Sequence, residues 1–168
     1  MVLFSFAVSA LLLFGLSFTT PAQARYSAIV IDADSGEVMF SRRADQRRYP
    51  ASLTKMMTLY QIFSAIEDGK LKLSQKLKVS RRAAGQTPSK IGLKRGSRIS
   101  VEKAIIAVAA KSANDAATVL SESLGETEFD FALRMTKTAR SLGMKSTRFR
   151  NASGLPNRRQ RTTARDMA

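Results

Sequence analysis

Two short motifs in this sequence hold residues that could carry out nucleophilic chemistry. Ser52 and Lys55 lie three positions apart at the start of a predicted helix, a spacing that puts both side chains on one helix face. A neutral lysine amine beside a serine hydroxyl can accept its proton, and the serine oxygen can then attack a carbonyl carbon. The free backbone N–H groups of a helix N-terminus would stabilise the resulting oxyanion.

The Ser-x-x-Lys pattern is too short to be specific on its own. It occurs again as Ser100 and Lys103, where we expect the serine to cap a helix and the lysine to lie in solvent. The Ser112-Ala113-Asn114 motif is the rarer signal, because the chain has only 3 Asn. It interrupts two apolar helical segments, where a polar loop can point into a cleft. The alternative is that Ser112 or Asn114 simply caps the next helix.

The composition restricts which other chemistry is available. The 168 residues include no Cys, His or Trp, which excludes disulfides, Cys/His zinc sites, thiol nucleophiles and the Ser-His-Asp triad. Only carboxylates could hold a metal, and we predict neither a metal nor another cofactor. A nucleophile must therefore be Ser, Thr or Lys, with Lys or a carboxylate as its base.

The chain is strongly basic. Lys and Arg total 28 against 13 Asp and Glu, a net charge of +15. Outside a membrane, such a charge suits anionic envelope polymers or lipid headgroups. We do not predict nucleic-acid binding, because few aromatic residues lie among the basic ones. The basic residues are scattered in pairs, so the simpler interpretation is a solvated basic surface.

The first 24 residues have the pattern of a secretory signal peptide. Residues 2–18 contain only apolar residues, Ser and Gly, and Ala22-Gln23-Ala24 forms a small-x-small cleavage site. The pattern predicts an exported protein, periplasmic or extracytoplasmic, whose mature part begins at Arg25. No Lys or Arg precedes the apolar run, which departs from the usual pattern. A retained membrane anchor is the alternative, so association with a membrane surface stays open.

Apolar periodicity and turn residues predict one hairpin followed by helices. The expected strands are 28–32, 37–42, 76–79 and 98–100, and the expected helices are 52–68, 101–110, 115–124, 128–142 and a short one from 164. The helix at 101–110 is so apolar that we expect it to be buried on most sides. The first helix carries an apolar stripe expected to face the core, made by Leu53, Met56, Met57, Tyr60, Phe63 and Ile66.

The two motifs together resemble the penicillin-recognising serine transpeptidase superfamily, and within it the low-molecular-weight D-alanyl-D-alanine carboxypeptidases. The resemblance rests on Pro50-Ala51-Ser52-Leu53-Thr54-Lys55-Met56, followed by Ser112-Ala113-Asn114-Asp115-Ala116, and it covers essentially all of 25–168. It implies an α+β fold of the β-lactamase/transpeptidase type. The chain would supply the N-terminal hairpin of the sheet and the helical lobe.

The resemblance also implies a role for each motif residue. Ser52 resembles the acylated nucleophile, and its backbone N–H one of two oxyanion donors. Lys55 resembles the base that must be neutral to accept a proton. Ser112 resembles the hydroxyl that relays a proton to the departing D-alanine, and Asn114 resembles the amide that orients Lys55 and the substrate backbone. The implied reaction removes the terminal D-alanine from peptidoglycan stem peptides, and β-lactams would acylate the same serine.

One motif of that family, a Lys-Thr-Gly strand, is absent from this sequence. Lys137-Thr138 is followed by Ala139 and lies within a predicted helix. In the family this strand lies well past the second motif, so we expect 25–168 to be an incomplete catalytic domain that lacks the C-terminal sheet strands. The alternatives are an inactive envelope-binding module and a serine β-lactamase, although residues 143–168 lack the Glu that the latter needs.

Overall fold

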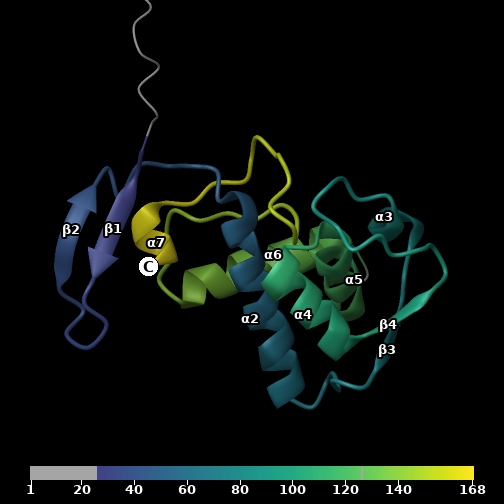
Figure 1. Cartoon of the computed structure of the whole chain (residues 1–168). Coiled ribbons are helices and arrows are strands. Elements are labelled where there is room, and N and C mark those ends of the chain that lie inside the picture. Colours follow the sequence, from purple (N-terminus) through teal and green to yellow (C-terminus); the bar gives the residue numbers. More distant parts are fainter. Residues whose placement is uncertain (1–25, 126) are drawn as a thin grey trace, which may run out of the picture.

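The computed structural model describes residues 26–125 and 127–168, so the predicted signal peptide at 1–24 lies outside the described residues. Within those two ranges, every helix is too short or too polar to span a membrane. The fold is α+β, as the resemblance implied. Two small antiparallel sheets lie at opposite ends of the molecule, and the longer helices fill the space between them (Figure 1).

The predicted hairpin is confirmed. Strands β1 (Ala28–Ile31) and β2 (Val38–Arg42) pair antiparallel. The carboxylate of Asp32 holds the turn, because its Oδ1 accepts hydrogen bonds from the backbone N–H and the hydroxyl of Ser35 at 2.8 and 2.7 Å. These bonds lower the pKa of Asp32. Gly36 completes the turn at φ +72°, in the left-handed region that glycine adopts without steric cost.

The first long helix, α2 (Thr54–Glu67), begins two residues later than predicted. A 3₁₀ turn over Ala51–Leu53 precedes it, so Ser52 lies in this turn and not in the first turn of the α-helix. Ala51 has a positive φ of 47°, an uncommon conformation for a residue with a side chain. The tight turn leaves Ser52 exposed at the start of the helix.

The predicted core stripe of α2 is wrong in part. Met57 is buried, but four other members are about half exposed: Leu53, Met56, Tyr60 and Phe63. The buried face instead includes the polar residues Thr54, Lys55, Thr58 and Gln61. Apolar spacing could not reveal this face, because its burial depends on hydrogen-bond partners far along the chain. Thr58, for example, donates to the Ala152 carbonyl at 2.7 Å.

The remaining elements match the predicted order closely. Ser100 caps α4 by accepting from the Lys103 N–H, as expected for the second Ser-x-x-Lys, and Thr127 caps α6 in the same way. A short helix that the sequence did not predict, α3, follows the cap residue Ser80. The elements are β3 (Lys76–Lys78), α3 (Arg81–Ala84), β4 (Arg98–Ser100), α4 (Val101–Lys111), α5 (Asn114–Leu124), α6 (Glu128–Ser141) and α7 (Ala164–Met167).

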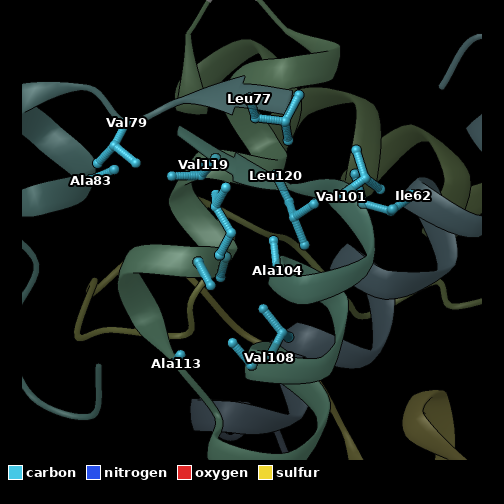
Figure 2. Packing of buried hydrophobic residues seen from close by; sticks show 14 of the residues in the cluster. Ile62, Leu77, Val79, Ala83, Val101, Ala104, Val108, Ala113, Val119 and Leu120 are labelled. Carbon is cyan, nitrogen blue, oxygen red and sulfur yellow. The ribbon is translucent and has the colours of Figure 1, made fainter. Parts of the chain in front are cut away.

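Helix α5, not α4, is the most deeply buried helix. Every residue of 114–121 is buried, whereas α4 buries one face and leaves Ile106 58% exposed. The expectation that 101–110 is buried on most sides is therefore wrong. Small residues such as Ala104 on α4 let the helices approach closely. Figure 2 shows Val101, Ala104 and Val108 facing a core shared with Ile62, Leu77, Val119 and Leu120.

Shortening Leu120 to Ala tests this core. The side chain is fully buried, so Leu120→Ala should lower the free energy of unfolding by about 2–5 kcal/mol through lost burial and a residual cavity. The matched control is Leu133→Ala on α6, where the leucine is 47% exposed and the expected change is within about 0.5 kcal/mol. Urea denaturation followed by circular dichroism measures both. Equal losses would show that α5 is not the centre of the core.

Candidate active site

The amine of Lys55 is buried beneath the turn that carries Ser52. Lys55 is only 5% exposed, and its Nζ donates a hydrogen bond of 2.6 Å to the backbone carbonyl of Ser153. Among the described residues this is the one hydrogen bond that Nζ makes, and its partner is uncharged. Burial therefore lowers the pKa of Lys55 from its ordinary value, which favours the neutral amine.

Ser52, Lys55 and Ser112 line one cavity. Its volume is about 540 Å³, and its wall is completed by residues of the 3₁₀ turn, of α2 and of the C-terminal part of α4. Two segments that are far apart in the sequence thus bring two hydroxyl groups and one amine to the same space. Such a set can supply a nucleophile, a base and a proton relay to a substrate that enters the cavity.

Ser112 reaches the cavity because helix α4 ends in a left-handed residue. Ser112 is the C-cap at φ 54° and ψ 36°, and its N–H still donates to the Val108 carbonyl at 3.0 Å. The next N–H, that of Ala113, donates back to Ala107 at 3.1 Å, which closes the helix end. A serine held at positive φ is strained, and such strain occurs often at functional sites.

Asn114 has different surroundings from the other three predicted site residues. It is 5% exposed and does not line the cavity of Ser52. Its Nδ2 donates to the carbonyls of Thr87 and Pro88 at 3.3 and 3.2 Å, and its N–H donates to Ser89 at 2.7 Å. In this structure Asn114 therefore ties the 87–89 loop to the N-terminus of α5.

The neighbouring Asp115 secures the next part of the same loop. Its carboxylate is fully buried and accepts hydrogen bonds from the backbone N–H groups of Ile91, Gly92 and Leu93 at 2.9–3.2 Å. The bonds give each of these three backbone N–H groups a hydrogen-bond partner within the protein. The segment Ser112-Ala113-Asn114-Asp115 thus has two structural roles, since Ser112 lines the cavity and Asp115 fixes a loop.

Sequence reasoning missed the turn at 151–154, which contacts both Lys55 and the backbone beside Ser52. Besides the Ser153 carbonyl, it contributes Gly154, which packs directly on the 3₁₀ turn. A Cβ at Gly154 would lie 1.8 Å from the Ala51 carbonyl oxygen, so only glycine fits. The available sequence signal was Asn151 three residues before a glycine, a pattern typical of turns.

Several buried groups hold the 151–154 turn in place. The Gly154 N–H donates to Asn151 Oδ1 at 2.7 Å, and the Asn151 N–H donates to Gln160 Oε1 at 3.2 Å. The Ala152 N–H donates to Glu128 Oε1 at 3.1 Å. Each donor has a partner, so the position of the carbonyl that binds Lys55 is determined by residues from α6 and from the C-terminal loop.

Two glutamates that could activate a water molecule lie elsewhere. Glu122 and Glu128 line a different cavity, of about 440 Å³, together with Arg82. Glu128 is 4% exposed and accepts from Arg82 Nε at 2.7 Å. Burial raises the pKa of Glu122, which accepts from the Ser80 hydroxyl at 2.9 Å. Neither glutamate lines the cavity of Ser52, so they give the β-lactamase alternative no support.

Comparison with known families agrees with the motifs. A family model described as D-alanyl-D-alanine carboxypeptidase matches residues 16–168. The chain is 37% identical over 142 residues to the D-alanyl-D-alanine carboxypeptidase DacF of Bacillus subtilis, covering 84% of this chain and 36% of the relative. It is 36% identical over 148 residues to DacA of Escherichia coli K12, covering 84% and 37%. The chain thus spans little more than a third of the length of these curated relatives.

Solved structures give the same result. The D-alanyl-D-alanine carboxypeptidase DacD of Francisella tularensis superimposes with a TM-score of 0.82 at 38% identity, covering 84% of this chain and 34% of that one. Penicillin-binding protein D2 of Listeria monocytogenes, solved in a cefotaxime-bound form, superimposes with a TM-score of 0.73 at 33% identity, covering 84% and 57%. The described residues therefore adopt part of the fold of these penicillin-binding proteins.

Replacing Gly154 tests the contact beneath Ser52. Gly154→Ala should destabilise the protein, because the new methyl group meets the Ala51 carbonyl and because φ is +86°. Gly143→Ala is a matched control, since its φ of +82° is similar but nothing lies within 4 Å of the added Cβ. The backbone strain of about 1–2 kcal/mol is then common to both variants. We expect Gly154→Ala to cost about 1–3 kcal/mol more in chemical denaturation. Equal costs would contradict the close packing.

Proposed function

This chain belongs to the D-alanyl-D-alanine carboxypeptidase family, and on that premise we propose that its protein removes the terminal D-alanine from peptidoglycan stem peptides through an acyl-enzyme at Ser52. Its likeness to solved penicillin-binding proteins supports the proposal, as does the presence of both motifs. The protein would need no metal or organic cofactor, because the chemistry uses hydroxyl groups and an amine alone. We further propose that residues 1–24 direct its export, so that it acts outside the cytoplasm.

The observation that carries this proposal is the cavity shared by Ser52, Lys55 and Ser112. A lysine that is to act as a base must be neutral at working pH, and burial lowers the Lys55 pKa in that direction. A neutral amine has two N–H groups and one lone pair. It can donate to the Ser153 carbonyl and still accept a proton from a serine hydroxyl.

In the acylation step, Lys55 Nζ takes the proton of Ser52 Oγ as this oxygen attacks the carbonyl carbon of the terminal peptide bond. The backbone N–H of Ser52 would donate to the oxyanion of the tetrahedral intermediate. Collapse of the intermediate breaks the C–N bond. Ser112 passes a proton to the leaving amine of D-alanine and regains one from protonated Lys55, which leaves an ester on Ser52.

In the deacylation step, water attacks the ester carbonyl and the C–O bond to Ser52 breaks. Lys55 accepts a proton from the water and Ser52 recovers its own, so the products are the shortened peptide and the free enzyme. The Asn114 amide would bind the peptide backbone, as the resemblance implies. In this structure that amide donates to Thr87 and Pro88, so contact with substrate would require it to exchange these partners.

A β-lactam should label Ser52 covalently. The Ser52 oxygen attacks the strained amide of the ring, and the nitrogen that leaves the carbonyl carbon remains part of the molecule bound to Ser52. The protein as its gene encodes it is incubated with benzylpenicillin and its intact mass is measured. We expect a mass increase of one penicillin, located by peptide mapping to the Ser52 peptide, and complete loss of the adduct in Ser52→Ala.

Ser100→Ala is the control for this experiment, because it removes the serine of the second Ser-x-x-Lys, which only caps α4. Losing the cap costs about 1 kcal/mol of stability, yet the adduct should remain. An adduct that persists in Ser52→Ala, or a folded native protein that takes up no penicillin, would contradict the proposed role of Ser52.

A further inference from the structure

A second cavity, on a different part of the surface, is lined almost wholly by cations. Its volume is about 330 Å³, and it shares no lining residue with the cavity of Ser52. Three segments that are distant in the sequence build it, which are the loop after β2, the end of α6 with its following loop, and the loop before α7 (Figure 1). We call it the basic pocket, and its cations are Arg47, Arg140, Lys145, Arg148, Arg159 and Arg161.

The backbone directs two of these arginines, Arg148 and Arg161, toward the pocket. Arg148 and Arg161 face each other across an antiparallel bridge, with N···O distances of 2.8 and 3.0 Å in both directions. The residues that flank these two arginines are buried, Thr147 and Phe149 beside Arg148 and Gln160 and Thr162 beside Arg161. Because side chains alternate across an extended segment, burial of the flanking residues directs Arg148 and Arg161 outward to the pocket.

The cations of the basic pocket have no carboxylate partner within the described residues. The ion pairs found there are Lys70–Asp68, Arg82–Glu128 and Arg165–Asp45, and none includes a cation of the pocket. Asp166 lies beside the pocket, but its carboxylate accepts from the Ser146 N–H and the Thr147 hydroxyl at 2.8 and 2.6 Å. Gathering like charges without counter-charge opposes folding, unless an anion is bound there.

Part of the pocket is already ordered for binding. The guanidinium of Arg161 lies 3.7 Å from the centroid of the Tyr49 ring and donates to its hydroxyl at 2.8 Å. The Arg140 guanidinium donates to the Met144 carbonyl. Arg148 and Arg159 make no side-chain hydrogen bond within the described residues, so all their donors can turn to a ligand. Arginine pairs with phosphate oxygens through two parallel N–H groups, which a lysine cannot do.

We propose that the basic pocket binds a diphosphate group, either free or as part of a diphosphate ester. A ligand with several adjacent negative charges can contact arginines from all three segments, whereas one monophosphate would leave most of them uncompensated. The volume, at the lower end of the range of small-molecule pockets, suits a compact anion more than a bulky organic ligand. This inference does not depend on the chemistry proposed for Ser52.

Isothermal titration calorimetry of the full chain with inorganic pyrophosphate tests the proposal, with inorganic phosphate and sulfate as weaker anions. We expect pyrophosphate to bind at least about tenfold more tightly than phosphate, and binding to weaken as ionic strength rises. The variant Arg148→Gln/Arg159→Gln should lose at least about tenfold in affinity. Arg148→Lys/Arg159→Lys keeps the charge but not the paired donors, and should also bind more weakly.

The matched control is Arg98→Gln/Arg134→Gln, which removes the same charge from two exposed arginines outside the pocket. It should retain pyrophosphate affinity within about twofold. Equal losses in the two Gln variants would overturn the proposal, because net charge alone would explain the binding. Vesicles of phosphatidylglycerol and phosphatidylcholine form the last arm. Vesicle binding that depends on Arg148 and Arg159, without pyrophosphate binding, would also overturn it and assign the pocket to a membrane surface.

Discussion

The buried hydrogen bond between Lys55 Nζ and the Ser153 carbonyl is the interaction on which the rest of the site depends. It provides a partner for an amine that would otherwise be costly to bury, but a carbonyl does not compensate a positive charge as a carboxylate would. Burial against a neutral acceptor therefore favours the unprotonated amine. Together with the bond from Thr58 to the Ala152 carbonyl, the Lys55 hydrogen bond gives the buried polar face of α2 its partners, whereas much of the apolar stripe is exposed.

This hydrogen bond couples the site to residues far from it. The Ser153 carbonyl belongs to the 151–154 turn. Hydrogen bonds to Glu128 from α6 and to Gln160 from the C-terminal loop hold this turn in place. Gly154 allows the turn to pack on the backbone next to Ser52. Lys55 and the turn that carries Ser52 thus depend on the same supporting residues, so a change at Glu128 should affect both without direct contact with either.

The sequence predicted what depends on local chemistry and periodicity. The hairpin, the order of the long helices and the cap at Ser100 follow from turn residues, apolar spacing and a capping side chain, and the structure confirms them. The prediction from sequence failed where the burial of a side chain depends on partners that are distant in the chain. The polar face of α2 and the exposed side of α4 could not be read from spacing, because tertiary contacts decide which face of a helix is covered. The 151–154 turn was missed for the same reason, since its role arises from a carbonyl and from an absent side chain.

We propose that Lys55 acts as the base and that burial favours its neutral form, and its pKa can be measured directly. Heteronuclear NMR of protein labelled at the lysine side chains would titrate all 11 lysines, with Lys55→Arg assigning the signal and the ten others serving as internal references. The account predicts that Lys55 loses its proton at a clearly lower pH than the exposed lysines. A Lys55 signal that titrates together with them would contradict it, because the amine would then be protonated when Ser52 must be activated.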